Sequence, residues 1–145
     1  MQTFLPYPDF ARSARCLDNR RLGKQRVEAY QILRTLERSD DPQRRGWRNH
    51  PAVLMWRGYE DALRLYMNVM ITEWVARGFR NTMALAPVEG APEAPAWLSD
   101  PAFHAAHRSN LLRKDPAHYG QFGWTEAPDM PYVWPTARQF GGNGE

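Results

Sequence analysis

Hydrophobic residues recur at helical spacing in three stretches of the chain. The first follows Asp18, a suitable N-cap, and ends before the acidic and proline residues at 40–42. The apolar positions that share one side of this stretch are Leu22, Ala29, Leu33 and Leu36. Because this spacing matches the 3.6-residue turn, it predicts a helix over about residues 19–37.

The other two stretches also have clear start and stop signals. Asn49 or His50 precedes Pro51, and apolar residues then continue at helical spacing to Gly78, which favours one long helix over residues 51–77. Asp100 and a following proline open the third stretch, which a second Asp-Pro pair closes at 115–116. This pattern predicts a helix over residues 101–114.

The segments between these helices are rich in proline, glycine and aromatic residues. Residues 1–10 favour an extended segment laid across the helices, residues 40–50 and 84–98 read as loops, and residues 141–145 are predicted to be disordered. No stretch alternates as a strand does. The expected class is therefore all-α, as a single compact domain over residues 1–140 with about three main helices and long irregular connections.

Glu28 lies outside the apolar stripe of the first predicted helix. With 100° per residue and Leu22 as zero, the apolar positions fall within about 40°, whereas Glu28 lies at about −120°, between Arg21 and Lys24. The carboxylate is therefore placed to meet a ligand as readily as to pair with Lys24.

Positive charge is concentrated in the first third of the chain. The net charge is +3, but residues 12–48 hold eleven basic side chains against five acidic ones, about +6, and the rest carries about −3. Such a segment suits a polyanion, and the aromatic content of 12% adds rings that could stack on bases. A solvated helix face that only maintains solubility is the alternative.

Several other functions have no motif to support them. The single cysteine, Cys16, allows no internal disulfide, and the His104–His107 pair has no third ligand at a fixed spacing. We find no nucleophile elbow, P-loop or dinucleotide fingerprint, and no apolar run long enough to span a membrane. We expect no metal or cofactor, and a soluble, monomeric, cytoplasmic protein associated with the nucleoid.

Four segments, in order, resemble the pyrimidine-dimer DNA glycosylase family, small helical enzymes typified by a phage endonuclease that repairs ultraviolet damage. They are LDNRRLGKQRVEAYQIL, GWRNHPAVLMW, EWVARGF and LLRKDPAHYGQF. The start MQTFLPY and the segments RLGKQR and HRSNLLRKDP are similar to a bacterial branch of that family.

The resemblance implies repair of damaged pyrimidines in double-stranded DNA, with an associated abasic-site lyase activity. In the family, the α-amine of the chain attacks C1′ of the damaged nucleotide, and a glutamate on the first helix assists. The matching residues here are Glu28 and the amine of Met1, as catalytic groups. Expected DNA contacts are Arg20, Arg21, Lys24, Arg26, His50, Arg113, Lys114 and Tyr119.

Residue 2 departs from the phage-type pattern, in which removal of Met exposes a Thr amine. Gln2 is bulky and disfavours removal of Met1, so we expect the Met1 amine itself to serve. The alternative to an enzyme is a nucleic-acid-binding protein that keeps this scaffold and its basic surface without catalysing a reaction.

Overall fold

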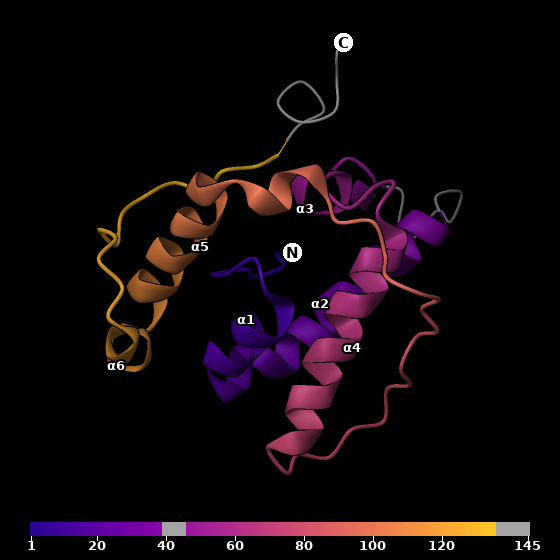
Figure 1. The fold of residues 1–145 in the computed structure, drawn as a ribbon, viewed down its shortest axis with the longest axis horizontal. Helices are drawn as coiled ribbons and strands as arrows, with labels where there is room; N and C mark the ends of the chain where they lie inside the picture. Colours follow the sequence, from indigo (N-terminus) through magenta and orange to yellow (C-terminus); the bar gives the residue numbers. More distant parts are fainter. Residues whose placement is uncertain (39–45, 136–145) are drawn as a thin grey trace, which may run out of the picture.

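The computed structural model describes residues 1–38 and 46–135, which contain six α-helices and no β-strand (Figure 1). The expected all-α class is confirmed. The helices are α1 (Phe10–Cys16), α2 (Asn19–Glu37), α3 (Pro51–Leu54), α4 (Glu60–Ala76), α5 (Pro101–Lys114) and α6 (Pro116–Tyr119), with 3₁₀ turns η2 (Ala96–Ser99) and η3 (Gly120–Phe122). The predicted disordered tail at 141–145 and most of the predicted loop at 40–50 lie outside the described residues.

Helix α2 has the bounds that its pattern predicts, and it packs against α4 to form the centre of the molecule. Asp18 caps it by accepting a hydrogen bond from the Arg21 N–H at 3.2 Å. Gly23 lets the two helices approach closely, because a Cβ there would lie 2.8 Å from Trp74 Cζ3. Trp74 has little room to move away, since it stacks on Phe79 and its indole N–H donates to the Arg80 carbonyl.

The prediction of one helix over residues 51–77 is wrong, because the chain breaks between α3 and α4. Gly58 adopts a left-handed φ of +88°, which ends the helical path. Trp56, in the break, is fully buried and donates its indole N–H to Thr3 Oγ1 at 3.0 Å. Tertiary contact with the N-terminal segment therefore overrides the helical periodicity of the sequence.

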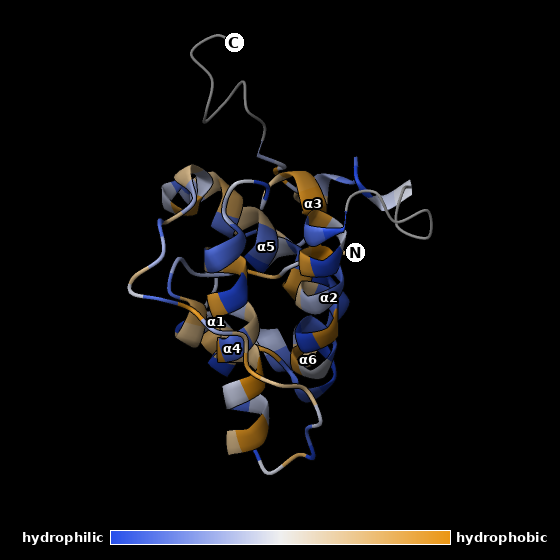
Figure 2. Cartoon of the chain, turned by 90° about the vertical axis from the view of Figure 1, so that its right-hand side faces the viewer, coloured by the Kyte–Doolittle hydropathy of each residue, from blue (hydrophilic) through white to orange (hydrophobic). Residues whose placement is uncertain are grey.

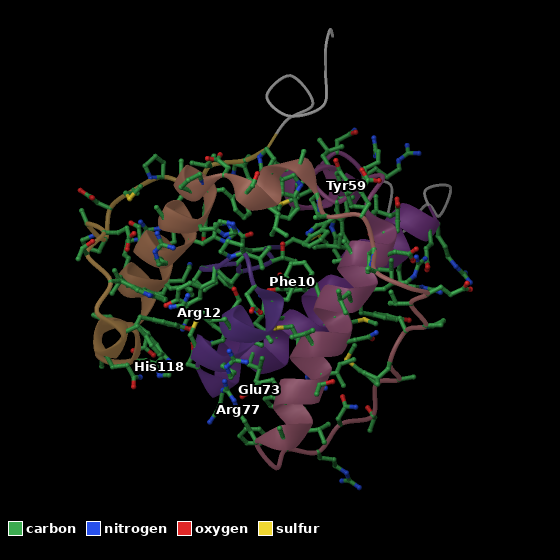
Figure 3. The ribbon with its side chains drawn as sticks, in the orientation of Figure 1. Phe10, Arg12, Tyr59, Glu73, Arg77 and His118 are labelled. Carbon is green, nitrogen blue, oxygen red and sulfur yellow. The ribbon has the colours of Figure 1, made fainter. Side chains whose placement is uncertain are left out.

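Helix α1 was not expected, since its residues lie in and after the proline-rich N-terminal stretch. Asp9 caps it, and Arg77 of α4 binds its far end, where the guanidinium donates to the carbonyls of Ala14, Arg15 and Leu17. Glu73 holds Arg77 in place at 2.9 Å, and Figure 3 shows the two side chains directed at the α1 end. One arginine thus binds three carbonyls at the end of the short helix, where further backbone N–H donors are lacking.

Helix α5 begins and ends as predicted, with Asp100 as the N-cap and Pro101 in the first turn. Hydrophilic and hydrophobic residues alternate around the helices in Figure 2, and the apolar sides meet in one core. No helix in the described part of the chain is long and apolar enough to cross a bilayer.

The N-terminal segment is extended, as expected, and runs into the middle of the helices (Figure 1). Residues 3–6 are buried, yet within residues 1–38 and 46–135 no strand lies beside them to pair with their backbone. Side chains from the surrounding helices take that role. The Phe4 N–H donates to Gln25 Oε1 at 2.9 Å, the Phe4 carbonyl accepts from the Tyr66 hydroxyl, and the Pro6 carbonyl accepts from Arg108.

Two buried histidines of α5 hold Leu5. The Leu5 N–H donates to His107 Nδ1 at 2.9 Å. His104 Nδ1 lies 2.7 Å from the Leu5 carbonyl oxygen, and His104 Nε2 lies 2.7 Å from the Leu98 carbonyl oxygen. His107 must keep Nδ1 unprotonated to accept this bond. Burial, and then the proximity of His104, lower the pKa of His107 to about 3.

This burial predicts acid sensitivity of the fold. The pKa of His107 is about 3 when folded and about 6.5 when unfolded, so its contribution to stability is complete above pH 6.5 and is lost as pH falls toward 3. We expect the unfolding free energy to fall by about 1.4 kcal/mol per pH unit in this interval from this group alone. In His107→Asn, which keeps an acceptor near the Nδ1 position, urea unfolding between pH 7 and 4 should show a shallower decline. Parallel curves for the two proteins would contradict this account.

Candidate active site

The α-amino group of Met1 lies beside the carboxylate of Glu28. The amine nitrogen is 3.8 Å from Glu28 Oε1, and the N–H of Gln2 donates to the same oxygen at 3.0 Å. The side chains of Met1 and Glu28 are only 7% and 20% exposed. The carboxylate thus binds the start of the chain, and the pairing with Lys24 that spacing alone allowed is not formed.

Two side chains on one flank of α2 set this geometry. Gln25, one turn before Glu28, donates from Nε2 to the Gln2 carbonyl at 3.0 Å and accepts the Phe4 N–H through Oε1. The Tyr66 hydroxyl of α4 lies 2.6 Å from that same Gln25 oxygen and 2.9 Å from the Phe4 carbonyl oxygen, so the two acceptors share its one proton and the buried amide is itself fixed. Because the backbone is held on both sides of residue 2, the amine cannot drift far from the carboxylate.

His50 lies within the electrostatic reach of this pair. Its Nδ1 accepts the Ala52 N–H at 3.0 Å and so caps α3. Partial burial and the positive charge of the chain's amine lower the pKa of His50, while Glu28 opposes the shift. The ring packs edge-on against Trp134, at a centroid distance of 6.3 Å.

The segment after α6 returns to the same place. Its backbone is attached to α5, where Ser109 donates to the Ala127 carbonyl and Asn110 donates to the Met130 carbonyl. Tyr132 then packs edge-on against His107 and lies beside the side chain of Gln2. The two ends of the described chain therefore meet at the amine.

Four cations from α2 and α5 form a basic cluster: Arg21, Lys24, Arg113 and Lys114. Partial burial and then the charges of Arg21, Arg113 and Lys24 lower the pKa of Lys114. Arg21 also pairs with Asp18 at 3.2 Å, whereas no carboxylate in the described residues pairs with Lys24 or Lys114. Arg20 is exposed nearby on α2. Anionic groups could bind here with little competition from the protein's own carboxylates.

Two expected DNA contacts lie elsewhere. Arg26 is two residues from Glu28, so it lies about 160° around α2, where it covers Trp74 and donates to Asn81 Oδ1 at 2.6 Å. Tyr119 is fully buried, and its hydroxyl donates to Asp18 Oδ1 and accepts the Asp18 N–H. Tyr119 thus fixes the N-cap of α2, and in this structure it presents no surface to DNA.

Sequence reasoning missed Gln2, Gln25 and Tyr132. Gln25 carried a weak signal, because a glutamine at the edge of an apolar stripe needs buried partners. The positions of Gln2 and Tyr132 follow only from tertiary folding. Cys16 is buried, and desolvation raises the pKa of its thiol to about 12, which leaves it protonated and unreactive at neutral pH. In the described residues, no three His, Cys, Asp or Glu side chains gather as metal ligands would.

The basic cluster predicts how DNA binding responds to salt. Lys114→Ala removes one cation from this surface, so the slope of log Kd against log salt concentration should decrease by about 1. Fluorescence anisotropy with a labelled duplex measures this slope. Arg80→Ala is the matched control, since Arg80 is exposed in the segment that follows α4, next to the Asn81 that contacts Arg26. Equal slopes for the Lys114 variant and the unmodified protein would show that Lys114 does not bind a DNA phosphate.

Comparison with known proteins identifies the family. No curated protein and no solved structure matches the chain. The family model described as pyrimidine dimer DNA glycosylase matches residues 1–87, which include the N-terminal segment, α2 with Glu28, and α3 with α4. The match covers more than half of the chain, and the chain therefore belongs to the pyrimidine dimer DNA glycosylase family.

Proposed function

We propose that this protein excises damaged pyrimidines from duplex DNA and then cuts the strand as an abasic-site lyase. The observation that carries the proposal is the α-amine held 3.8 Å from Glu28, beside a basic cluster. An α-amine ordinarily titrates near pH 7.7–8.0, so a useful fraction of such groups is neutral and nucleophilic under physiological conditions. Proximity of amine and carboxylate supplies the orientation that nucleophilic catalysis needs.

The reaction begins with base displacement. The neutral amine nitrogen forms a bond to C1′ as the glycosidic bond breaks, and the bonding electron pair leaves with the base nitrogen, which is then protonated. Glu28 faces the carbon where positive charge develops, so its carboxylate stabilises the transition state electrostatically. It also accepts the proton that the attacking nitrogen loses.

The second step cuts the strand. Glu28 returns the proton it accepted to O4′ as the C1′–O4′ bond breaks, which opens the deoxyribose ring and converts the amine adduct into an iminium between the chain's nitrogen and C1′. Glu28 removes a proton from C2′, the electron pair forms a C2′–C3′ double bond, and the C3′–O bond breaks to release the 3′ phosphate. The carboxylate is suitable for this proton transfer because it already contacts the amine nitrogen.

The surrounding cations would hold the DNA while this occurs. Arg21, Lys24, Arg113 and Lys114, with Arg20 beside them, are suited to bind phosphates on either side of the lesion. His50 would lie at the edge of the amine site. Duplex DNA as the partner, a monomeric state and a cytoplasmic location at the nucleoid remain predictions of this proposal.

Glu28→Gln tests the mechanism. Glutamine keeps an oxygen that can accept the Gln2 N–H, so the fold and DNA affinity should be retained, while strand cleavage should fall by roughly 10²–10⁴-fold because the proton acceptor is lost. Cleavage of ultraviolet-irradiated and abasic-site duplexes is measured together with thermal melting and DNA binding. Intact mass, recorded first, establishes which residue carries the free amine.

Glu37→Gln is the matched control, because Glu37 lies on the same helix but pairs with Arg64 at 2.8 Å. It should cleave as the unmodified protein does. Full cleavage by Glu28→Gln would overturn the mechanism. Binding of duplex DNA without cleavage by the unmodified protein would favour the non-catalytic alternative, in which the amine and Glu28 form only a structural ion pair.

A further inference from the structure

Gln2 is the residue next to the candidate nucleophile, and its backbone is fixed on both sides. Its N–H donates to Glu28 at 3.0 Å and its carbonyl accepts from Gln25 Nε2 at 3.0 Å. These bonds leave only the side chain of Gln2 free to act on something else. The side chain begins one residue from the amine that meets the sugar.

The amide of Gln2 has an unused hydrogen-bonding group. Its Oε1 is buried and has no hydrogen-bond partner in the described part of the chain. The amide lies beside the Tyr132 hydroxyl, which does not donate to Oε1. Buried acceptors without a donor are uncommon in folded proteins because their desolvation is not compensated. An acceptor of this kind beside a reactive amine indicates that its donor comes from the substrate.

We propose that the Gln2 side chain reads the pyrimidine whose glycosidic bond is cut, with Oε1 accepting a hydrogen bond from the N3–H of a thymine-type ring. This inference rests on the proposed function. The amide nitrogen would donate to a ring carbonyl adjacent to N3, so the two ends of one amide match the two neighbouring groups of the base. Neutral cytosine has no N3–H, and it would leave Oε1 without its donor.

The covalent structure of a nucleotide agrees with this assignment. The ring nitrogen attached to C1′ is two bonds from N3, so the sugar carbon and the reading edge lie close together in one nucleotide. Likewise, the amine and the Gln2 side chain belong to adjacent residues of one extended segment. The side chain of Tyr132 lies beside the amide, so the base would displace it on binding.

Gln2→Met tests the proposal, because methionine has nearly the length of glutamine but neither donor nor acceptor. The backbone bonds of residue 2 are retained, and the bulky side chain still disfavours removal of Met1, which intact mass verifies. Base excision from a duplex with one thymine dimer should fall roughly tenfold to a hundredfold relative to cleavage of an abasic duplex, which has no base to read. Gln121→Met, at an exposed glutamine in η3, is the matched control and should leave this ratio unchanged.

A chemically modified substrate identifies the hydrogen bond itself. A dimer methylated at N3 lacks the donor, so the unmodified protein should excise it more slowly than the normal dimer, while Gln2→Met should excise the two at similar rates. Equal loss of dimer and abasic cleavage in Gln2→Met, or equal sensitivity of both proteins to N3 methylation, would overturn the reading role. If the unmodified protein cleaves neither duplex, the proposed function fails instead.

Discussion

The structure depends on a buried N-terminal segment whose backbone is hydrogen-bonded by side chains of the surrounding helices. Residues 3–6 are buried, and side chains from α2, α4 and α5 satisfy their backbone groups. An unpaired buried N–H or carbonyl is costly, so each of these side chains is needed at its position. The segment thereby fixes the amine of residue 1, and the core of the protein and its candidate nucleophile are specified by the same hydrogen bonds.

The site combines groups with opposite requirements. Glu28 is only 20% exposed and lies beside the chain's amine, while Arg21 and Lys24 are on the same flank of α2 and have Arg113 and Lys114 of α5 near them. None of these cations forms an ion pair with Glu28 in the described residues, because the carboxylate is engaged by the amine and by the Gln2 N–H, and Lys24 and Lys114 are thus available to an anionic ligand. Partial burial and the positive charge of the chain's amine lower the pKa of His50, at the edge of the site.

Local signals predicted much of the fold, and long-range contacts determined the rest. Capping residues gave α2 and α5 correctly, and helical geometry placed Glu28 off the core. The pattern did not predict the break at Gly58, because Trp56 fits the helical spacing of apolar residues. In the structure its indole N–H instead donates to Thr3 Oγ1. Tyr119 was expected to contact DNA, but it is buried in the core and its hydroxyl binds Asp18, 101 residues away. Contacts of this range leave no periodicity in the sequence.

The central claim is that the amine of the N-terminal residue is the nucleophile, and the site of covalent attachment tests it most directly. Borohydride reduction during reaction with an abasic-site duplex, followed by protease digestion and mass spectrometry of the peptides, locates the modified nitrogen. The structure predicts a sugar adduct on the α-nitrogen of the residue held against Glu28. An adduct on the side chain of Lys24 or Lys114, with the N-terminal peptide unmodified, would contradict this account.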